Sequence, residues 1–282
     1  MTLDAQGVPK MYEYNADTPT SLLESSIAQW FWKEDVHGEH DQFNSIHEAL
    51  IARWQRVRSH YPHARVLHFG CIFDSLEDVA NVEYMMETAV QAGWRVKILD
   101  MARIGVNRVD QFFDEQDEPI ELMFKLYPWE WMVRERFGAQ LIASPTRWVE
   151  PPWKMILSNK AILPLLWELF PDHPNLLRAS FSAEDFAGKA HVRKPVFSRE
   201  GANVELTLPD GSVIAEDGRY GAEGHIYQAY APLPRFRDRY ATLGVWMVGD
   251  DAVGLCVREE DQPITRNTSY FVPHYFTKDD AT

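Results

Sequence analysis

The pattern of residues 64–100 constrains the fold more than any other part of the chain. "ARVLHFGCIF" (64–73) has the continuous apolar character of a buried strand, "SLEDVANVEYMMETAVQAGW" (75–94) has the spacing of a helix, and "RVKILD" (95–100) is a second strand. This order predicts a βαβ unit with parallel strands and a right-handed crossover. No G-x-G-x-x-G motif follows the first strand, so a dinucleotide site there is poorly supported.

The segments on either side of this unit mix helices and strands. We expect a strand over residues 8–15, a helix at about 43–60, a strand at 120–128 and a helix from about 129 to 137. The adjacent prolines of "WVEPPWKM" (148–155) indicate a boundary. Beyond it we expect a helix capped by Ser158, followed by a β-rich tail with hairpin turns at Asp210-Gly211 and Gly249-Asp250. The predicted fold class is α+β with a βαβ insert.

The overall composition indicates a globular protein of acidic character. The 282 residues are 45% hydrophobic and 13% aromatic, and the net charge is −14. This charge argues against nucleic acid as the main partner and is compatible with a cationic substrate such as a polyamine. No stretch approaches the ~20 apolar residues of a membrane span, and the first residues lack a signal-peptide pattern. Cys71 and Cys256 form no C-x-x-C motif, so we expect a cytoplasmic protein, with a single disulfide as an open alternative.

The segment "MYEYNADTPT" (11–20) spaces three oxygen-bearing side chains two residues apart. On a strand, Glu13, Asn15 and Asp17 would share one face while Tyr12 and Tyr14 face the other way. A row of oxygen ligands on one face suits a hard cation such as Mg²⁺. The alternative is an edge strand with a solvated polar face.

Two lysines and one loop have the composition of a phosphate site. Lys160 is expected in the first turn of a helix, where the helix dipole favours anions, and Lys194 on a strand. The loop 198–203 places Arg199 among small residues and a glycine, as in a mobile flap that closes over phosphates. The alternative is that both lysines are ordinary surface residues. Neither segment matches the G-x-x-x-x-G-K-[ST] phosphate loop, which excludes that class of nucleotide enzyme.

Other catalytic classes find little support. His37 and His40 in "HGEH" lack the i, i+4 spacing of the helical zinc motif, and the intervening glycine indicates a loop, so the spacing argues against zinc. No G-x-S-x-G elbow of a serine hydrolase is present. Both cysteines lie in apolar, strand-like runs, where cysteine is more often a core residue than a nucleophile.

Several long stretches together resemble the synthetase domain of glutathionylspermidine synthase. They resemble still more closely the stand-alone relatives of that domain, which are regarded as acid–amine ligases. The stretches are "YEYNADTPTSLLES", "FKLYPWEWM", "EPPWKMILSNKAILPLLWELFPDHPNLL", "RKPVFSREGANV", "IYQAYAPLP" and "GLCVREEDQPI". They follow the family's order and cover nearly the whole chain.

The resemblance implies an ATP-grasp fold and an ATP-dependent ligase that requires Mg²⁺. In the implied reaction a carboxylate takes the γ-phosphoryl group of ATP to become an acyl phosphate, and an amine then displaces phosphate. The implied partners are a small peptide-like carboxylic acid and a polyamine-like amine, with no nucleic acid and no membrane.

The resemblance also implies roles for individual residues. Glu13 and Asn15 match Mg²⁺ ligands, and Thr18 and Thr20 stand near the acid substrate. Lys160 and Lys194 match the lysines on the nucleotide phosphates, and Gln228 matches the start of the segment that passes the adenine. Arg199 matches the arginine of the flap, and Arg258 matches the arginine near the transferred phosphoryl group. Phosphoryl transfer depends mainly on positioning and charge neutralisation, and these residue types supply both.

The implied domains are 1–60 as part of the catalytic lobe, 61–150 as a βαβ pre-ATP-grasp-like domain, and 151–282 as the ATP-grasp lobes. Within the last, 154–235 is the nucleotide lobe and 236–276 carries the catalytic strands. ATP is predicted between the lobe 154–235 and a lobe that combines 1–35 with 236–276.

One departure from the family pattern concerns the start of the chain. The family has an arginine and an aspartate, in an R-x-D pattern, just before the stretch that begins here at "MTLD", and Asp4 falls a few residues beyond that place. We therefore expect a fragment, a late-start gene product, or an N-terminally incomplete relative that binds nucleotide with little or no ligase turnover. A plain interaction module would show no effect of nucleotide at all.

Overall fold

The computed structural model describes residues 1–277, so residues 278–282 of the predicted 151–282 domain lie outside the described residues. Two compact units are present. Unit 1 combines Met1–Asn15, Ile156–Gly244 and Cys256–Val272, whereas unit 2 combines Ala16–Met155, Val245–Leu255 and the segment that begins at Pro273. Each unit therefore brings together segments far apart in the sequence.

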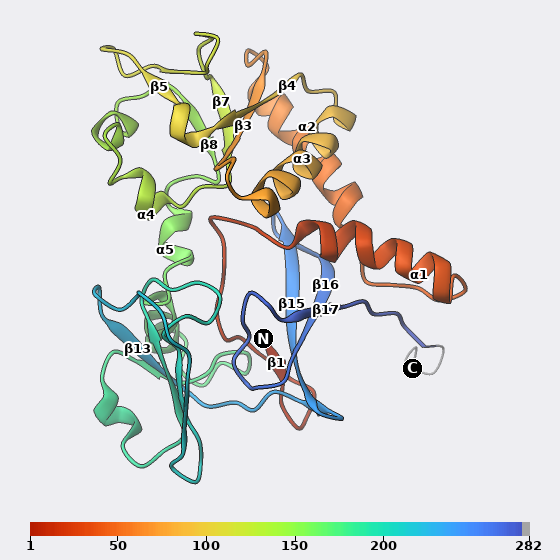
Figure 1. Ribbon diagram of the computed structural model, residues 1–282, viewed down its shortest axis with the longest axis vertical. Coiled ribbons are helices and arrows are strands. Elements are labelled where there is room, and N and C mark those ends of the chain that lie inside the picture. Colours follow the sequence, from red (N-terminus) through yellow and green to blue (C-terminus); the bar gives the residue numbers. More distant parts are fainter. Residues whose placement is uncertain (278–282) are drawn as a thin grey trace. The chain divides into compact units, whose positions relative to one another are not determined.

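Unit 2 contains a parallel four-stranded sheet in the order β4-β3-β7-β8 (Figure 1). Its strands are β3 (Leu67–Cys71), β4 (Val96–Asp100), β7 (Leu122–Lys125) and β8 (Arg147–Val149). Helix α3 (Leu76–Gln91) joins β3 to β4, and the Ser75 hydroxyl accepts a hydrogen bond from the Asp78 N–H at its start. The predicted βαβ unit is confirmed.

Alternation along the central strands gives this sheet a core on each face. On β7, Leu122 and Phe124 pack in the larger core together with α3 and with α2 (Ile46–His60). Met123, between them, packs in a second core that includes Met132 of α4 (Trp129–Met132). Burial on both faces accounts for the continuous apolar runs that predicted these strands.

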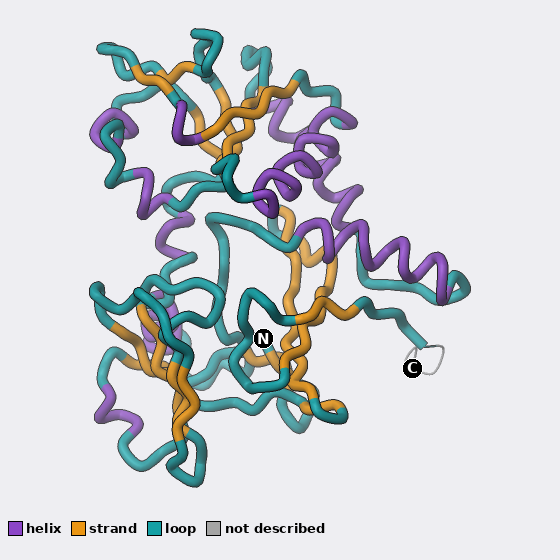
Figure 2. The backbone as a smooth tube through the Cα atoms, viewed as in Figure 1, coloured by secondary structure: helices purple, strands orange, loops and turns teal. Residues whose placement is uncertain are grey.

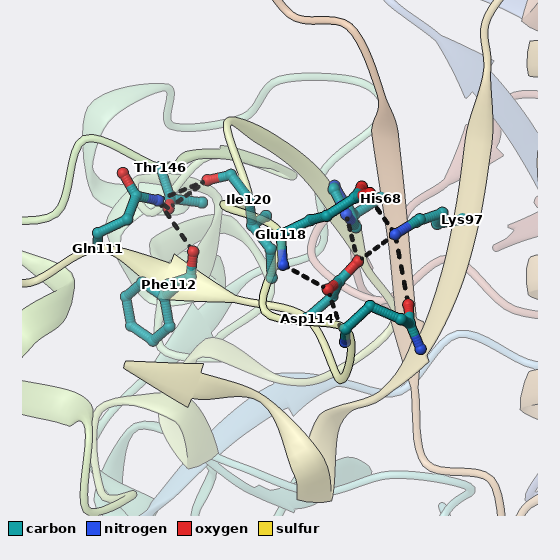
Figure 3. Close-up of polar contacts among 9 residues, drawn as sticks. His68, Lys97, Gln111, Phe112, Asp114, Glu118, Ile120 and Thr146 are labelled. Carbon is teal, nitrogen blue, oxygen red and sulfur yellow. Dashed lines mark hydrogen bonds and ion pairs between the residues drawn. The ribbon is translucent and has the colours of Figure 1, made fainter. Parts of the chain in front are cut away.

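A buried carboxylate ties two of these parallel strands together (Figure 3). His68 on β3 and Lys97 on β4 are in register, and both contact Asp114. The Asp114 carboxylate lies 2.6 Å from the Lys97 Nζ and 3.4 Å from the His68 Nε2, and its other oxygen accepts the Gln116 and Glu118 N–H groups. Burial lowers the pKa of His68, although hydrogen bonding to Asp114 acts in the opposite direction.

The remaining elements of unit 2 are short, apart from one helix. Helix α1 (Gln29–His37) continues a π-helical turn at Glu24–Ala28, and β5 (Gly105–Val106) pairs with β6 (Phe112–Phe113). Single 3₁₀ turns occur at Met101–Arg103 and Gly138–Leu141. The helix predicted at 129–137 is shorter, because α4 ends at Met132 and separate turns follow it. Among residues 1–277, no helix has the length and apolar character to cross a membrane.

Unit 1 contains an antiparallel sheet in the order β12-β11-β10-β13-β9. Its strands are β9 (Ala179–Ser180), β10 (His191–Pro195), β11 (Glu205–Thr207), β12 (Val213–Ala215) and β13 (His225–Ala229). Helix α6 (Ile162–Leu169) packs on it through Leu163, which shares a small core with Ile226. Figure 2 shows the long loops that connect these short strands. The chain also forms α5 (Lys154–Leu157), a 3₁₀ turn at Ala183–Phe186, and a pair of β1 (Thr2–Leu3) with β2 (Pro9–Lys10).

A second sheet is built from β14 (Arg235–Phe236), β15 (Arg239–Val248), β16 (Asp251–Glu260) and β17 (Tyr270–Val272), in that order. Both predicted hairpin turns are confirmed. Gly211 joins β11 and β12 with φ 84°, and Gly249 joins β15 and β16 with φ 67°, a left-handed conformation that glycine adopts without strain. The α+β fold class is therefore confirmed.

Candidate active site

Lys194 and Gln228 form the centre of a polar cluster in unit 1. Lys194 lies opposite Ile226 in the pairing of β10 with β13, so Gln228, two residues further along β13, faces the same side of the sheet. The Lys194 Nζ donates to the Gln228 Oε1 over 2.8 Å. Both residues are buried, with 6% and 1% of their surface exposed, so the amide and the ammonium group are held in fixed positions.

The same two side chains anchor the segment that carries Glu13. The Lys194 Nζ donates to the Tyr12 carbonyl over 2.9 Å, and the Gln228 Nε2 donates to the Met11 carbonyl over 3.2 Å. Strand pairing covers only Pro9–Lys10, so the strand predicted over 8–15 is too long. In place of a partner strand, these side chains and the Asn175 carbonyl, which accepts the Met11 N–H, bind the backbone beyond Lys10 and so position Glu13.

Lys160 completes this cluster from a loop that precedes a helix. We predicted it in the first helical turn, which is wrong, because α6 begins at Ile162. The Lys160 backbone N–H instead donates to the Val196 carbonyl over 3.1 Å. Its Nζ lies 3.3 Å from the Glu13 carboxylate and donates to the Ser198 carbonyl over 2.7 Å. The structure thus brings together four of the predicted site residues: Glu13, Lys160, Lys194 and Gln228.

The electrostatics of this cluster are dominated by its two lysines. The field of Lys160, helped by that of Lys194, holds the pKa of the Glu13 carboxyl well below its usual range, so this carboxylate is ionised at neutral pH. Its side chain is 55% exposed and can therefore reach a ligand from solvent. Burial, together with the nearby Lys160, lowers the pKa of Lys194 to about 8, while Glu13 acts to raise it.

The residues present fit an anionic ligand with a divalent cation. Two buried ammonium groups face a single carboxylate, which leaves one positive charge without compensation inside the cluster. Burial is the main reason that the pKa of Lys194 is lowered, so its ammonium group is short of solvation, and phosphate oxygens next to it would supply the missing contacts. Glu13 and the exposed Asn15 offer the carboxylate and amide oxygens that Mg²⁺ prefers.

Arg258 and Arg199 belong to the same unit but are held by other contacts. The Arg258 Nη2 donates to the carbonyls of Arg266 (2.6 Å) and Asn267 (3.1 Å), and its guanidinium lies over the Phe271 ring at 5.0 Å. Its Nε is buried and has no hydrogen-bond partner among the described residues. Arg258 is thus fixed in place through its Nη2, while its Nε–H is not used by these contacts.

The flap around Arg199 is a tight turn in this structure. Its carbonyl accepts the Ala202 N–H, and Gly201 has φ 75°. A Cβ on Gly201 would lie 2.6 Å from the Thr265 carbonyl oxygen, so the loop packs closely against this neighbouring segment of unit 1. Lys160 also binds this loop, through the Ser198 carbonyl.

Thr18 and Thr20 lie in unit 2, where an ion pair missed by the sequence reasoning fixes their segment. The carboxylate of the neighbouring Asp17 is paired with the Lys125 Nζ and accepts the Trp129 N–H over 2.7 Å. The side chains of Asp17 and Lys125 are 1% and 0% exposed. The strand pattern predicted that Asp17 shares a face with Glu13 and Asn15. This is wrong, because the Asp17 side chain is buried in the ion pair. The signal that could have revealed this buried ion pair was the lysine at position 125, inside the largely apolar strand "IELMFKLYP".

Comparison of the sequence with known proteins identifies the family to which the chain belongs. A family model described as "Glutathionylspermidine synthase preATP-grasp" matches residues 1–277. A Haemophilus influenzae protein named "Putative acid--amine ligase" is 42% identical over 279 residues, which cover 95% of this chain and 71% of that protein. The trypanothione synthetase of Crithidia fasciculata is 31% identical over 93% of this chain, but the chain spans only 44% of that longer protein.

Solved structures share the fold. A glutathione synthetase-like effector from Globodera pallida superposes with a TM-score of 0.58 and 10% identity, and the match covers 98% of this chain and 74% of that one. At this identity the likeness concerns the fold alone.

Proposed function

Because the chain belongs to the glutathionylspermidine synthase family, we propose that it is an ATP-dependent acid–amine ligase. The family relationship supports the ligase class. The observation that carries the ATP dependence is the cluster of Glu13, Lys160 and Lys194, with its uncompensated positive charge.

Each candidate site residue of unit 1 then has a defined task. Lys160 and Lys194 would bind the phosphates, and Gln228 would hold Lys194 in position beside the nucleotide. Glu13 and Asn15 would hold Mg²⁺, which neutralises charge on the phosphates. Arg258 would offer N–H donors that its backbone contacts leave unused to the transferred phosphoryl group, and Arg199 would close the flap over it.

In the proposed reaction, a carboxylate oxygen of a peptide-like acid attacks the γ-phosphorus, and ADP leaves. The nitrogen of a polyamine-like amine then attacks the acyl carbon, inorganic phosphate leaves, and the amine loses a proton as the amide forms. We assign Thr18 and Thr20 to the acid, since their hydroxyl groups can bind a carboxylate or a peptide group.

ATP binding is tested by thermal unfolding with ATP, with and without Mg²⁺. Saturation at about 100 times the Kd stabilises a protein by about 2.7 kcal/mol. Lys160→Ala and Lys194→Ala each remove a charge-assisted contact worth about 1.5–3 kcal/mol, so each should weaken ATP binding by roughly 10- to 100-fold. Lys189→Ala, at an exposed lysine of the same unit, is the matched control and should bind ATP normally. Unchanged stabilisation of both site variants would refute the assignment.

Turnover is tested by ADP release with a panel of peptide-like acids and polyamines. The proposal expects ADP release that requires both substrates and that is lost in Arg258→Ala. The alternative, a nucleotide-binding protein with little or no turnover, predicts ATP-dependent stabilisation without ADP release. A version extended upstream through the family's R-x-D segment, measured in parallel, shows whether that segment raises turnover.

A further inference from the structure

A second group of metal-ligand side chains lies in unit 2, outside the proposed ligase site. His37, Glu39 and His40 each offer a ligand atom, and these atoms all lie within 4.8 Å of one another. Within residues 1–277, they are the one cluster of three or more histidine, cysteine or acidic side chains gathered in this way. The histidine spacing differs from the helical i, i+4 zinc motif, but the backbone here is a turn.

The turn explains how this spacing brings the two imidazoles together. Helix α1 ends at His37, Gly38 follows as its C-cap, and the His40 N–H donates to the His37 carbonyl over 2.9 Å. The chain therefore reverses between the two histidines and places Glu39 at the bend. The carbonyl end of a helix carries a partial negative charge, which favours a cation at this position.

The distances between the donors approach those of a zinc site. Zn²⁺ bonds to histidine and carboxylate of about 2.0–2.2 Å place the ligand atoms of a tetrahedron about 3.3–3.6 Å apart. The Glu39 Oε1 and the His40 Nε2 are already 3.2 Å apart. With all donors within 4.8 Å, the largest gap has to close by at most about 1.5 Å, a distance that small side-chain rotations can supply.

Aromatic contacts hold the imidazole rings in this arrangement. The Tyr275 ring stacks on His37 with a centroid distance of 4.0 Å and lies 4.9 Å from the ring of His40. Backbone pairing secures Tyr275, because the N–H of the next residue, Phe276, donates to the Asp41 carbonyl over 2.8 Å. The two rings are therefore organised by a second segment of the chain, unlike histidines on a free surface loop.

The donor set selects the class of ion. Two imidazoles suit a borderline divalent metal such as Zn²⁺, whereas Mg²⁺ prefers oxygen ligands and Cu(I) prefers sulfur. Three protein ligands leave a fourth tetrahedral position for water. We propose that His37, Glu39 and His40 form a Zn²⁺ site, separate from the Mg²⁺ and ATP ligands of unit 1.

The test uses the full, tag-free chain and Co²⁺ as a spectroscopic probe for Zn²⁺, without ATP or Mg²⁺. The proposal expects one equivalent of Co²⁺ to give the visible absorption of a tetrahedral site, and Zn²⁺ to displace it. His37→Ala and Glu39→Gln should each weaken Co²⁺ binding by more than about tenfold, because loss of a group that merely orients a ligand already costs about 10- to 100-fold. Binding should also weaken as the pH falls, since the imidazoles must be neutral to bind metal.

His60 and His63 provide a control pair with the same three-residue spacing. Both are exposed, whereas His37 and His40 are half-buried, and within residues 1–277 they belong to no gathered donor cluster. The double variant His60→Ala/His63→Ala should bind Co²⁺ like the wild type. The proposal fails if the wild type shows no saturable binding, if His37→Ala binds unchanged, or if the control variant loses binding equally. Far-ultraviolet circular dichroism shows that each variant is folded, so a loss of binding reports the site itself.

Discussion

The buried ion pair of Asp17 and Lys125 gives a sharp test of how unit 2 is held together. We expect Lys125→Met to destabilise the unit strongly, although methionine fills a similar volume. The Lys125 Nζ contacts the Asp17 carboxylate and also donates to the Tyr127 carbonyl over 2.9 Å. Its removal leaves an Asp17 carboxylate that is 1% exposed and still accepts the Trp129 N–H over 2.7 Å but has lost its counter-ion.

The magnitude follows from the burial of both partners. Removing one member of a fully buried pair costs about 3–5 kcal/mol, because the remaining charge has no counter-ion. Asp17→Asn in the same chain removes that charge and keeps an oxygen that can accept the Trp129 N–H. The double variant Asp17→Asn/Lys125→Met should therefore regain much of the loss and be more stable than Lys125→Met alone. This non-additivity is the signature of a charge effect.

Urea unfolding, followed by tryptophan fluorescence and circular dichroism, measures these differences. Arg136→Met removes an exposed positive side chain of the same unit, and a surface change of this kind should stay within about 0.5 kcal/mol of the wild type. The reasoning is refuted if Lys125→Met costs less than about 1 kcal/mol, or if the double variant is less stable than the single one.

Three further predictions concern pH and the flap. Burial lowers the pKa of His68 in the folded state. The neutral imidazole therefore contributes its full stabilisation above about pH 6.5, and this stabilisation is lost as the pH falls toward the folded-state pKa. In urea unfolding, His68→Gln should show a shallower dependence of the unfolding free energy on pH, by up to about 1.4 kcal/mol per pH unit. Burial lowers the pKa of Lys194 to about 8, so its positive charge declines above that pH. ATP affinity, measured by calorimetry, should therefore fall between about pH 7.5 and pH 9.5 in the wild type. It should not fall in Lys194→Arg, because the arginine keeps its charge over this range. Gly201→Ala forces a Cβ against the Thr265 carbonyl at φ 75°, so trypsin should cleave after Arg199 faster than in the wild type; equal rates would show that the loop does not depend on this contact.

The parts of the fold that sequence reasoning predicted best are those with a continuous hydrophobic pattern. The βαβ unit at 64–100 was predicted because β3 is buried along its whole length and α3 has a clear cap at Ser75. Turns with glycine at positive φ were equally visible, as at Gly211 and Gly249. The strand predicted at 8–15 was too long because side chains of distant strands and the Asn175 carbonyl, and not a paired strand, bind the backbone at Met11 and Tyr12. No local pattern records such contacts.

The candidate site was predictable in its members but not in its geometry. Chemistry and family resemblance pointed to Glu13, Lys160 and Lys194, whereas the 3.3 Å approach of Glu13 to Lys160 depends on residues far apart in the sequence. Lys160 was misplaced by two residues, because the helix begins at Ile162 and not at the serine that resembles a cap. The proposed zinc site departs from the sequence interpretation for a related reason, since the spacing of its histidines was compared with a helix and the chain forms a turn at Gly38.

Two lysines inside buried strands show how the same costly feature can serve stability in one unit and, in our proposal, nucleotide binding in the other. Burial lowers the pKa of both Lys125 and Lys194, which means that each ammonium group is deprived of water. Lys125 contacts a buried carboxylate directly, so its charge is compensated within the fold. Among the described residues, the Lys194 Nζ donates to neutral oxygens alone, those of Tyr12 and Gln228, while Glu13, whose charge acts to raise its pKa, is shared with Lys160. A buried cation that the fold leaves incompletely compensated gains the most from an anionic ligand. Compensation of charge, more than burial, therefore separates the structural lysine from the one we assign to nucleotide binding.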